Sequence, residues 1–466
     1  MSDAAVAFAS IADLGRLLRR RSVSSVELTK SYLARLAKHG PRLNSIVTLM
    51  PERALREARR ADADLAAGRD RGPLHGIPYA VKDLIAAKGA PTTWGARPFR
   101  AQTFDYDATV VRRLTAGGAV LLAKLAMIEL AGGMGYNQAD ASFTGPCKTP
   151  WNVDFWSGGS SSGSGSSVSA GLIPFAIGSE TDGSIMSPAN NCGVSGLRPT
   201  YGRVSRHGAM ALCWTLDKLG PLCRNAADTA TVLAVIAGRD ASDPTSVRRA
   251  FSYPNPLPKR WRLATVKGAA AKVQPAVRKN YLAAINSLGD AATVEEITLP
   301  DFPYDAMVGS IIAAEGGSAF RQIIQDGRVA QLSDPDGRRG GYSYLVTYAV
   351  DYVDAMRERR RLRRALDSIF TKVDALVAPT YSTVAPPIDG PFDKAYPGFS
   401  DGPLISACNL AGIPAISVPS GFGVHGLPTG VMFVGRPFGE AEIIRLAEAF
   451  QSRTDWHRRH PPAFLS

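Results

Sequence analysis

The sequence predicts an α/β fold in which helices surround one large, mostly buried sheet. Strand-like apolar runs alternate with segments of helical spacing along the whole chain, which is typical of an α/β layer architecture. The chain shows no internal repeat and no linker with a break in composition. Its 466 residues would allow about three domains by length. The unbroken alternation instead favours a single domain over residues 1–466.

Hydrophobic spacing places the individual elements. Residues 9–38 and 51–68 carry Leu and Ala at i, i+3 and i+4 intervals with charged residues between them, which predicts amphipathic helices. Further helices are expected at 109–116, 226–238, 304–325, 343–371 and 441–451. Apolar runs predict strands at 75–85, 119–124, 262–266, 374–379, 415–419 and 430–435. Residues 172–178 fit either a strand or a buried helix end, because so short a run shows no clear period.

The charge balance raises the question of a nucleic-acid partner. Lys and Arg number 54 against 41 Asp and Glu, which gives a formal charge of +13. The basic residues gather mainly at 16–21 (RLLRRR) and 357–364 (RERRRLRR), inside predicted helices, where a charge run is typical of a solvated face. Neither run has zinc-finger spacing or an RNP-like aromatic motif beside it. We therefore expect no nucleic-acid partner.

Cysteine and histidine usage excludes several chemistries. The five Cys are widely spaced without C-x-x-C, which argues against a disulfide framework and a structural zinc site and fits a reducing, cytoplasmic compartment. The six His form no H-E-x-x-H motif, so no metal is expected. The N-terminus has an acidic residue and a short apolar run before its arginines, which reverses signal-peptide order. No run of ~18 apolar residues exists, so we expect no membrane partner.

A Ser/Gly tract at 157–171 can be interpreted in more than one way. Composition alone suggests a flexible linker, but a linker here would interrupt the α/β alternation. Residues 159–163 also match G-x-S-x-G, the nucleophile elbow of α/β-hydrolases, which requires a strand directly before it. The preceding residues look like a loop, yet three histidines lie downstream in the required order, so this alternative stays open. They are His425, His457 and His460.

Two further features indicate nucleophilic catalysis. Lys82 lies among apolar residues in IPYAVKDLI, and a lysine is seldom fully buried unless it is paired or functional. It is either a strand-end lysine that reaches water or pairs with Asp83, or a buried amine whose lowered pKa lets it act as a base. The turn-like run 181–184 (TDGS) follows an apolar segment, and its backbone N–H groups could bind an anion beside the serine. A serine in a turn is, however, commonly only a turn residue.

Taken together, these segments resemble the amidase-signature family, and in particular its peptide-amidase-like and aryl-acylamidase-like members. The Gly/Ser-rich stretch 158–171 (GGSSSGSGSSVSAG) and the segment 178–205 (GSETDGSIMSPANNCGVSGLRPTYGRVS) are similar to the family hallmark, and 73–83 (PLHGIPYAVKD) is similar to a third family segment. Further similar stretches are 217–230, 375–387 and 409–422. The resemblance covers nearly the whole chain and is weakest over about 240–370.

The resemblance implies a fold and a catalytic site. The fold would be a large mixed β-sheet covered by helices on both faces, with a family-type core over about 70–235 and 373–452 and a variable specificity section over about 240–372. Carried over by position, Ser184 would be the nucleophile and Lys82 the base. Ser160 would relay protons between them and lie on a cis Ser160–Ser161 peptide bond. The oxyanion hole would be formed by the N–H groups of Thr181, Asp182, Gly183 and Ser184. No cofactor and no metal are implied.

Two departures from the family pattern bear on the substrate. Met186 replaces the arginine that usually follows the nucleophile by two residues, which makes an acidic or glutamine-like substrate less expected, and Asp182 replaces a glycine. We expect hydrolysis of a neutral, partly apolar small-molecule amide by a monomer or homodimer. The pocket candidates are Trp94, Met134, Tyr136 and Met186. Carbamates and esters remain open as substrates. The sequence also leaves open the A subunit of a tRNA-dependent amidotransferase and a non-catalytic binding protein.

Overall fold

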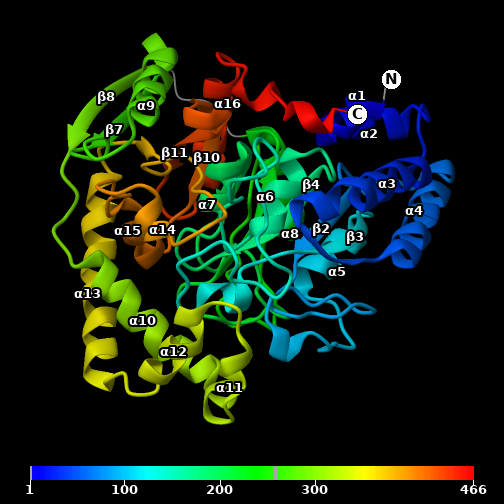
Figure 1. The fold of residues 1–466 in the computed structure, drawn as a ribbon. Helices are drawn as coiled ribbons and strands as arrows, with labels where there is room; N and C mark the ends of the chain where they lie inside the picture. The colour runs from blue at the N-terminus through cyan, green and yellow to red at the C-terminus, as the bar shows by residue number, and fades with distance from the viewer. Residues whose placement is uncertain (1–2, 255–259, 466) are drawn as a thin grey trace.

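The computed structural model describes residues 3–254 and 260–465 and is built around one mixed β-sheet (Figure 1). In these residues eleven strands form the sheet, in the order β1-β3-β2-β4-β6-β5-β10-β11-β9-β7-β8. Their bounds are β1 Ile46–Leu49, β2 Pro78–Lys82, β3 Val120–Leu125, β4 Phe175–Glu180, β5 Ser195–Arg198, β6 Lys218–Cys223, β7 Trp261–Val266, β8 Ala292–Ile297, β9 Ala375–Pro379, β10 Ala415–Phe422 and β11 Pro428–Val434. The trios β3-β2-β4 and β9-β7-β8 are parallel, and the other neighbours are antiparallel. The predicted α/β fold with a large mixed sheet is confirmed.

Both faces of the sheet are covered over most of its width. Every residue of β2, β3, β4, β5, β6, β9 and β11 is buried. Because successive side chains of a strand point to opposite faces, complete burial requires cover on both sides. The edge strands differ, since β1 is half-buried throughout and β8 is mostly exposed. Side chains at the ends of the central strands are therefore screened from water.

The helices flank the sheet along the chain. They are α1 Asp3–Ala7, α2 Ile11–Arg19, α3 Ser25–Leu43, α4 Pro51–Ala66, α5 Thr109–Ala116, α6 Ser162–Ser169, α7 Met186–Cys192, α8 Ala226–Ile236, α9 Pro275–Leu288, α10 Tyr304–Ala319, α11 Arg321–Gln325, α12 Pro335–Tyr344, α13 Ala349–Ile369, α14 Phe392–Ala395, α15 Leu404–Ala411 and α16 Glu440–Gln451. Within the described ranges, none has both the length and the apolarity needed to cross a membrane.

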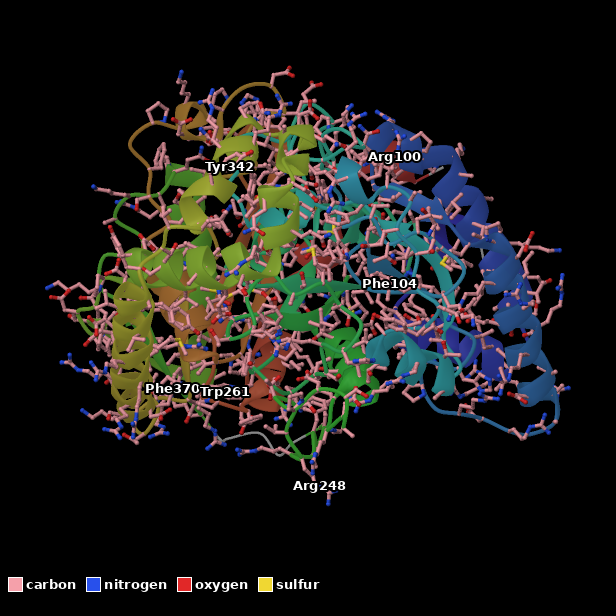
Figure 2. The ribbon with its side chains drawn as sticks, turned by 90° about the horizontal axis from the view of Figure 1, so that it is seen from below. Arg100, Phe104, Arg248, Trp261, Tyr342 and Phe370 are labelled. Atoms are coloured by element: carbon pink, nitrogen blue, oxygen red, sulfur yellow. The ribbon has the colours of Figure 1, made fainter. Side chains whose placement is uncertain are left out.

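The section at 240–372 supplies β7 and β8 at one end of the sheet together with α9 to α13. Figure 1 shows these elements on the side of the molecule opposite α1 to α4. Seen from below, Tyr342 on α12 and Phe370 after α13 lie on one side, and Arg100 and Phe104 lie on the other (Figure 2). The assignment of this section to substrate specificity, and the count of one domain, stay predictions.

Several predicted elements differ from the structure in their boundaries. The helix expected over 9–38 is two helices, because Ser10 and Ser24 each cap a new N-terminus, and Ser24 forms a capping box with Glu27. The ambiguous run 172–178 lies in β4 for its last four residues. Four strands were not predicted, namely β1, β5, β6 and β8. β1 and β5 have four residues each, β8 is largely exposed, and the apolar run of β6 is interrupted by Lys218, Gly220 and Pro221, so none shows the apolar run that marks a buried strand.

The Ser/Gly tract is not a flexible linker. Its residues 162–169 form α6, and every residue of that helix is buried. A Cβ atom on Gly163 would lie 2.3 Å from the carbonyl oxygen of Ser45, and one on Gly165 would lie 2.8 Å from that of Pro188. The helix is therefore packed backbone to backbone against its neighbours, which only small residues allow. This close packing explains why a buried helix lacks apolar side chains.

We predict that Gly163→Ala destabilises the protein. Its methyl group would meet backbone rather than a movable side chain, and overpacking of this kind costs about 1–3 kcal/mol. Gly309→Ala is the matched control, because Gly309 also lies in a helix but a Cβ atom added there would have no atom within 4 Å. Thermal unfolding should show a lower Tm for the first variant and an unchanged or higher one for the second. Equal Tm values would contradict the packing described for α6.

Candidate active site

Three side chains from separate segments meet at one edge of the sheet. Lys82 is the last residue of β2, Ser160 lies just before Ser161, the N-cap of α6, and Ser184 lies between β4 and α7. Because β2 and β4 are parallel neighbours, their carboxyl ends reach the same edge. Lys82 Nζ donates to Ser160 Oγ at 2.7 Å, and Ser160 Oγ donates to Ser184 Oγ at 2.9 Å. The structure thus brings together the three residues that the resemblance implied as a triad.

Lys82, the lysine of this hydrogen-bonded series, is fully buried. Burial lowers the pKa of Lys82 to about 7, although the carboxyl groups of Asp217 and Glu180 act in the opposite direction. Its amine also donates to Ser179 Oγ at 2.9 Å. Asp83 is not its partner, because that carboxylate pairs with Lys124 at 2.8 Å. The interpretation of Lys82 as a strand-end lysine paired with Asp83 is therefore wrong. Near pH 7 a large share of the amine is neutral and able to accept a proton.

The cis peptide bond lies one position earlier than expected. It joins Gly159 to Ser160, so the expectation of a cis Ser160–Ser161 bond is wrong. The backbone after Ser160 already enters α6: the Ser161 N–H donates to the Ser184 carbonyl at 3.2 Å, and the Ser161 carbonyl accepts from the Gly165 N–H at 3.2 Å. The Ser160–Ser161 bond is thus part of the helix entry and is trans.

The nucleophile-elbow alternative finds no support in the geometry. Ser161 is buried, and its hydroxyl donates to the Ser179 carbonyl at 3.0 Å. The three downstream histidines lie elsewhere: His425 packs against Phe155 and His460 stacks on Phe8, while His457 lies in the short 3-10 turn that follows α16. No strand leads directly into the motif either, since residues 157–161 lie in no strand or helix. The hydrolase elbow is therefore excluded.

The turn 181–184 has backbone N–H groups that donate to no group of the described residues. Gly183 has φ +80°, and a Cβ atom there would lie 2.6 Å from the Tyr381 hydroxyl, so this position requires glycine. In the described residues no protein group accepts a hydrogen bond from the backbone N–H of Asp182, Gly183 or Ser184. Free N–H groups beside a serine hydroxyl can hold the negative oxygen of a tetrahedral intermediate. Their role as an oxyanion hole, with Thr181 as a fourth member, stays a prediction.

The buried carboxylate of Glu180, the residue directly before this turn, holds the backbone that directly follows it. Glu180 Oε2 accepts from the N–H groups of Ile185 and Met186 at 2.8 and 3.0 Å, just after Ser184. Its other oxygen, Oε1, accepts from Arg198 at 2.8 Å and from Asn409 Nδ2 at 2.9 Å. The positive charge of Arg198 holds the pKa of Glu180 below its ordinary value despite full burial. Glu180 and Asn409 were missed by the sequence analysis, although each lies in a segment that resembles the family.

The four predicted pocket residues occupy separate places. Met186 begins α7 and is fully buried. Met134 packs against α12, and Trp94 packs against Phe99 and Phe320. Tyr136 joins an aromatic cluster that reaches the triad, because its neighbour Trp156 lies beside Gly159. The structure does not bring the four together, and a substrate-lining role stays a prediction for each.

A cavity of about 360 Å³ lies behind the triad. Its polar end reaches Ser179, which holds the Lys82 amine, and Thr181, which opens the turn. Apolar walls come from Leu84, Ala131, Met210, Leu212 and Leu219. Sequence analysis missed this cavity because the loop 206–217 has no periodic pattern.

Metal chemistry has no evident site in the described residues. No group of three or more His, Cys, Asp or Glu side chains is placed there to hold an ion. The five cysteines are buried and free. Burial raises the pKa of each thiol for which a shift is resolved, Cys147 to about 11 for example, so none is an activated nucleophile.

Comparison with known proteins agrees with this geometry. Residues 27–444 match the family model described as Amidase. The chain belongs to the amidase family. It is 38% identical to the A subunit of glutamyl-tRNA(Gln) amidotransferase from Roseiflexus sp. (strain RS-1), with 97% of this chain and 98% of that protein covered. Native peptide amidase from Stenotrophomonas maltophilia is 32% identical over 98% of both chains, with a TM-score of 0.86.

Another solved structure extends the comparison. A chain from a vestigial protein complex, described as revealing the origins of an s-triazine catabolic enzyme, is 30% identical to this one. The match covers 95% of this chain and 98% of that chain, with a TM-score of 0.88. The family resemblance in the sequence is therefore confirmed, and this amidase-family protein is an enzyme that acts on C–N bonds.

We predict that Arg198→Met strongly destabilises this amidase-family protein. The change leaves the buried Glu180 carboxylate without its cation, and breaking a buried pair costs about 3–5 kcal/mol. Arg262→Met is the control, because the Arg262–Asp374 pair has similar geometry at 2.7 Å but an exposed arginine, for which about 1 kcal/mol or less is expected. Urea unfolding measures both. Similar losses in the two variants would contradict the role given to Arg198.

Proposed function

We propose that this amidase-family enzyme hydrolyses the C–N bond of linear amides through an acyl-enzyme on Ser184. The observation that supports this most directly is the continuous hydrogen-bonded chain from Lys82 through Ser160 to Ser184. A serine hydroxyl is a weak nucleophile and needs a neighbouring base, which the buried amine supplies. The proposed substrate is a small, partly apolar molecule, and the enzyme works as a monomer or homodimer.

The first half of the reaction forms the acyl-enzyme. Ser184 Oγ attacks the amide carbonyl carbon while its proton moves to Ser160 Oγ and the Ser160 proton moves to Lys82 Nζ. The carbonyl oxygen becomes negative and is held by the free N–H groups of the turn 181–184, each worth about 3 kcal/mol. The C–N bond then breaks, and the departing nitrogen receives the proton from Lys82 through Ser160. Ser184 is left as an ester, and the amine leaves.

The second half returns the free enzyme. A water molecule gives a proton to the same chain as it attacks the ester carbonyl. The second tetrahedral intermediate collapses, the Ser184 oxygen recovers its proton, and the carboxylic acid leaves. The same carbonyl chemistry would serve carbamates and esters, which differ only in the group attached to the carbonyl carbon. Lys82 needs no cofactor for either half, because it both accepts and returns the proton.

A second candidate function is glutamine hydrolysis as the A subunit of a tRNA-dependent amidotransferase. The 38% identity to a protein of this kind over almost the full length of both chains favours it. Met186 speaks against it, because its apolar side chain stands where the arginine expected to contact a carboxylate or a glutamine would lie. Ammonia release from glutamine, measured with and without added tRNA, separates the two functions. Robust glutaminase activity would support the amidotransferase, and release only from apolar amides would support the hydrolase.

We predict a strict hierarchy among serine and lysine variants. Ser184→Ala should abolish amide hydrolysis, Lys82→Ala should nearly abolish it, and Ser160→Ala should leave a small remainder. Ser164→Ala is the control, because Ser164 is buried in α6 and its hydroxyl has no partner in the described residues. Steady-state kcat/KM on an aryl amide measures all four. Full activity of Ser184→Ala would refute the mechanism.

We also predict that activity rises with pH through the titration of Lys82. Its pKa of about 7 belongs to loss of the ammonium proton, so the amine can act as base above this pH and cannot below it. The logarithm of kcat/KM should climb between about pH 6 and 8, one unit either side of that pKa. Burial lowers the pKa of Lys218 to about 7 as well. If Lys218→Met keeps the wild-type midpoint of the pH profile, the titration belongs to Lys82. A flat profile would exclude lysine as the base.

A further inference from the structure

The cavity behind the triad begins beside the two residues that would carry the proton. Ser179 lines the cavity, and its hydroxyl accepts from Lys82 Nζ at 2.9 Å. Ala131 also lines it, and the Ala131 N–H donates to the Ile128 carbonyl at 3.0 Å within one turn. The Ile128 N–H in turn donates to the Ser160 carbonyl at 3.2 Å. The inner end of the cavity therefore lies next to Lys82 and next to the turn that contacts Ser160.

The walls of this cavity are mostly apolar. Leu219 of β6 and the loop residues Met210 and Leu212 are buried and line it. Trp214 of the same loop is 49% exposed, so the cavity opens to solvent beside an aromatic ring. Pockets that bind small molecules measure about 300–1,000 Å³ and are lined mainly by apolar side chains. At about 360 Å³, this cavity is large enough for one apolar group of a small substrate.

The Asp217 carboxylate on the cavity wall is taken up by hydrogen bonds within the protein. One of its oxygens accepts from the Thr181 hydroxyl at 2.6 Å. The other accepts from the backbone N–H groups of Leu212 and Cys213, both at 2.9 Å. These bonds tie the cavity wall to the first residue of the turn 181–184. Asp217 therefore shapes the inner end of the cavity instead of offering a free charge to a ligand.

The other ionisable side chains of the wall also have partners within the protein. The Arg206 guanidinium donates to Thr245 Oγ1 at 2.8 Å and lies 3.8 Å from Asp243 Oδ2. Asp243 accepts from the Arg206 N–H at 2.8 Å and from the Thr245 hydroxyl at 2.6 Å. The His207 ring stacks on Tyr106, with ring centroids 5.9 Å apart. A charged occupant would lose its water without gaining a free partner, so the cavity favours a neutral, apolar one.

The proton path indicates which part of a substrate reaches the cavity. In the proposed reaction the acyl part becomes bonded to Ser184, and the departing nitrogen takes its proton from Lys82 through Ser160. That nitrogen must therefore lie on the side of Lys82 and Ser160, which is where the cavity begins. A substituent on the nitrogen is thus the part of the substrate that lies closest to the apolar walls.

We propose that the cavity binds an apolar substituent on the leaving nitrogen, so that the enzyme cleaves N-substituted amides and releases primary amines. This rests on the proposed amide hydrolysis at Ser184 and narrows its substrate class. A bond forms between Ser184 Oγ and the carbonyl carbon, the C–N bond breaks, and the amine leaves with the proton that Ser184 gave up. Water then releases the carboxylic acid and returns the Ser184 proton. Release of ammonia from a primary amide would leave the cavity unfilled.

Three amides test this, because they carry a cyclohexyl ring in different places or not at all. N-methylbutanamide has no ring, N-(cyclohexylmethyl)butanamide has the ring on the nitrogen, and N-methyl-4-cyclohexylbutanamide has it on the acyl part. All three release alkylamines, so the leaving groups differ in bulk and not in kind. We expect the wild-type enzyme to prefer the second amide to the first by at least about tenfold in kcat/KM, because even one methylene in an apolar pocket is worth about tenfold or more.

Ala211→Phe is the variant that fills the cavity. Ala211 lines it from the loop 206–217 and is half-buried, so added bulk can enter the cavity from its edge. The preference for the N-cyclohexylmethyl amide should fall to about twofold or less, while kcat/KM on N-methylbutanamide stays within about twofold of wild type. Ala211→Val adds less bulk and should give an intermediate preference. The control is Ala271→Phe, at an exposed alanine that does not line this cavity, and it should behave as the wild type does.

The outcomes separate the inference from the proposed function. Equal kcat/KM values for the first two amides in the wild type, or a preference that survives in Ala211→Phe, would overturn the inference and leave amide hydrolysis standing. A preference for the acyl-extended amide that Ala211→Phe removes would place the acyl part in the cavity and also overturn it. So would a parallel loss on all three amides in both Ala211 variants, or a wild type that cleaves other amides but not N-(cyclohexylmethyl)butanamide. If the wild type cleaves no amide, the proposed function itself fails.

Discussion

The site depends on a lysine amine that is kept away from water. Lys82 ends a strand whose residues are all buried, between two parallel neighbours that are also fully buried. An ammonium in such a place is disfavoured, and its pKa therefore falls to about 7. The neutral amine can then draw a proton through Ser160 from Ser184. The sheet contributes to the proposed chemistry by being covered on both faces, which is what removes water from Lys82.

Two buried carboxylates at or beside the site are each paired with a buried cation. Glu180 is held by Arg198 and Asn409, and Asp83 is held by Lys124. Despite full burial, the positive charge of Arg198 holds the pKa of Glu180 below its ordinary value, and Glu180 in turn holds the N–H groups of Ile185 and Met186.

The sequence was enough to predict which three side chains meet at the site, but not which residues hold them in place. Lys82, Ser160 and Ser184 could be placed because each lies in a long segment that resembles the family, and the structure brings them within 2.7 and 2.9 Å of one another. Asn409 could not be linked to Glu180, because 229 residues separate them and no local pattern records that contact. The helix α6 was not predicted either, since helical periodicity is read from apolar residues and α6 has almost none.

Mass spectrometry of the trapped acyl-enzyme tests the central claim most directly. The enzyme is mixed with an activated aryl amide at pH 6 and pH 8, quenched in acid at short times and digested. The account predicts that the acyl mass appears on the peptide that contains Ser184 and that it accumulates faster at pH 8, because Lys82 is then neutral. Acylation of Ser160, Ser161 or a cysteine, or a rate at Ser184 that is the same at both pH values, would contradict it.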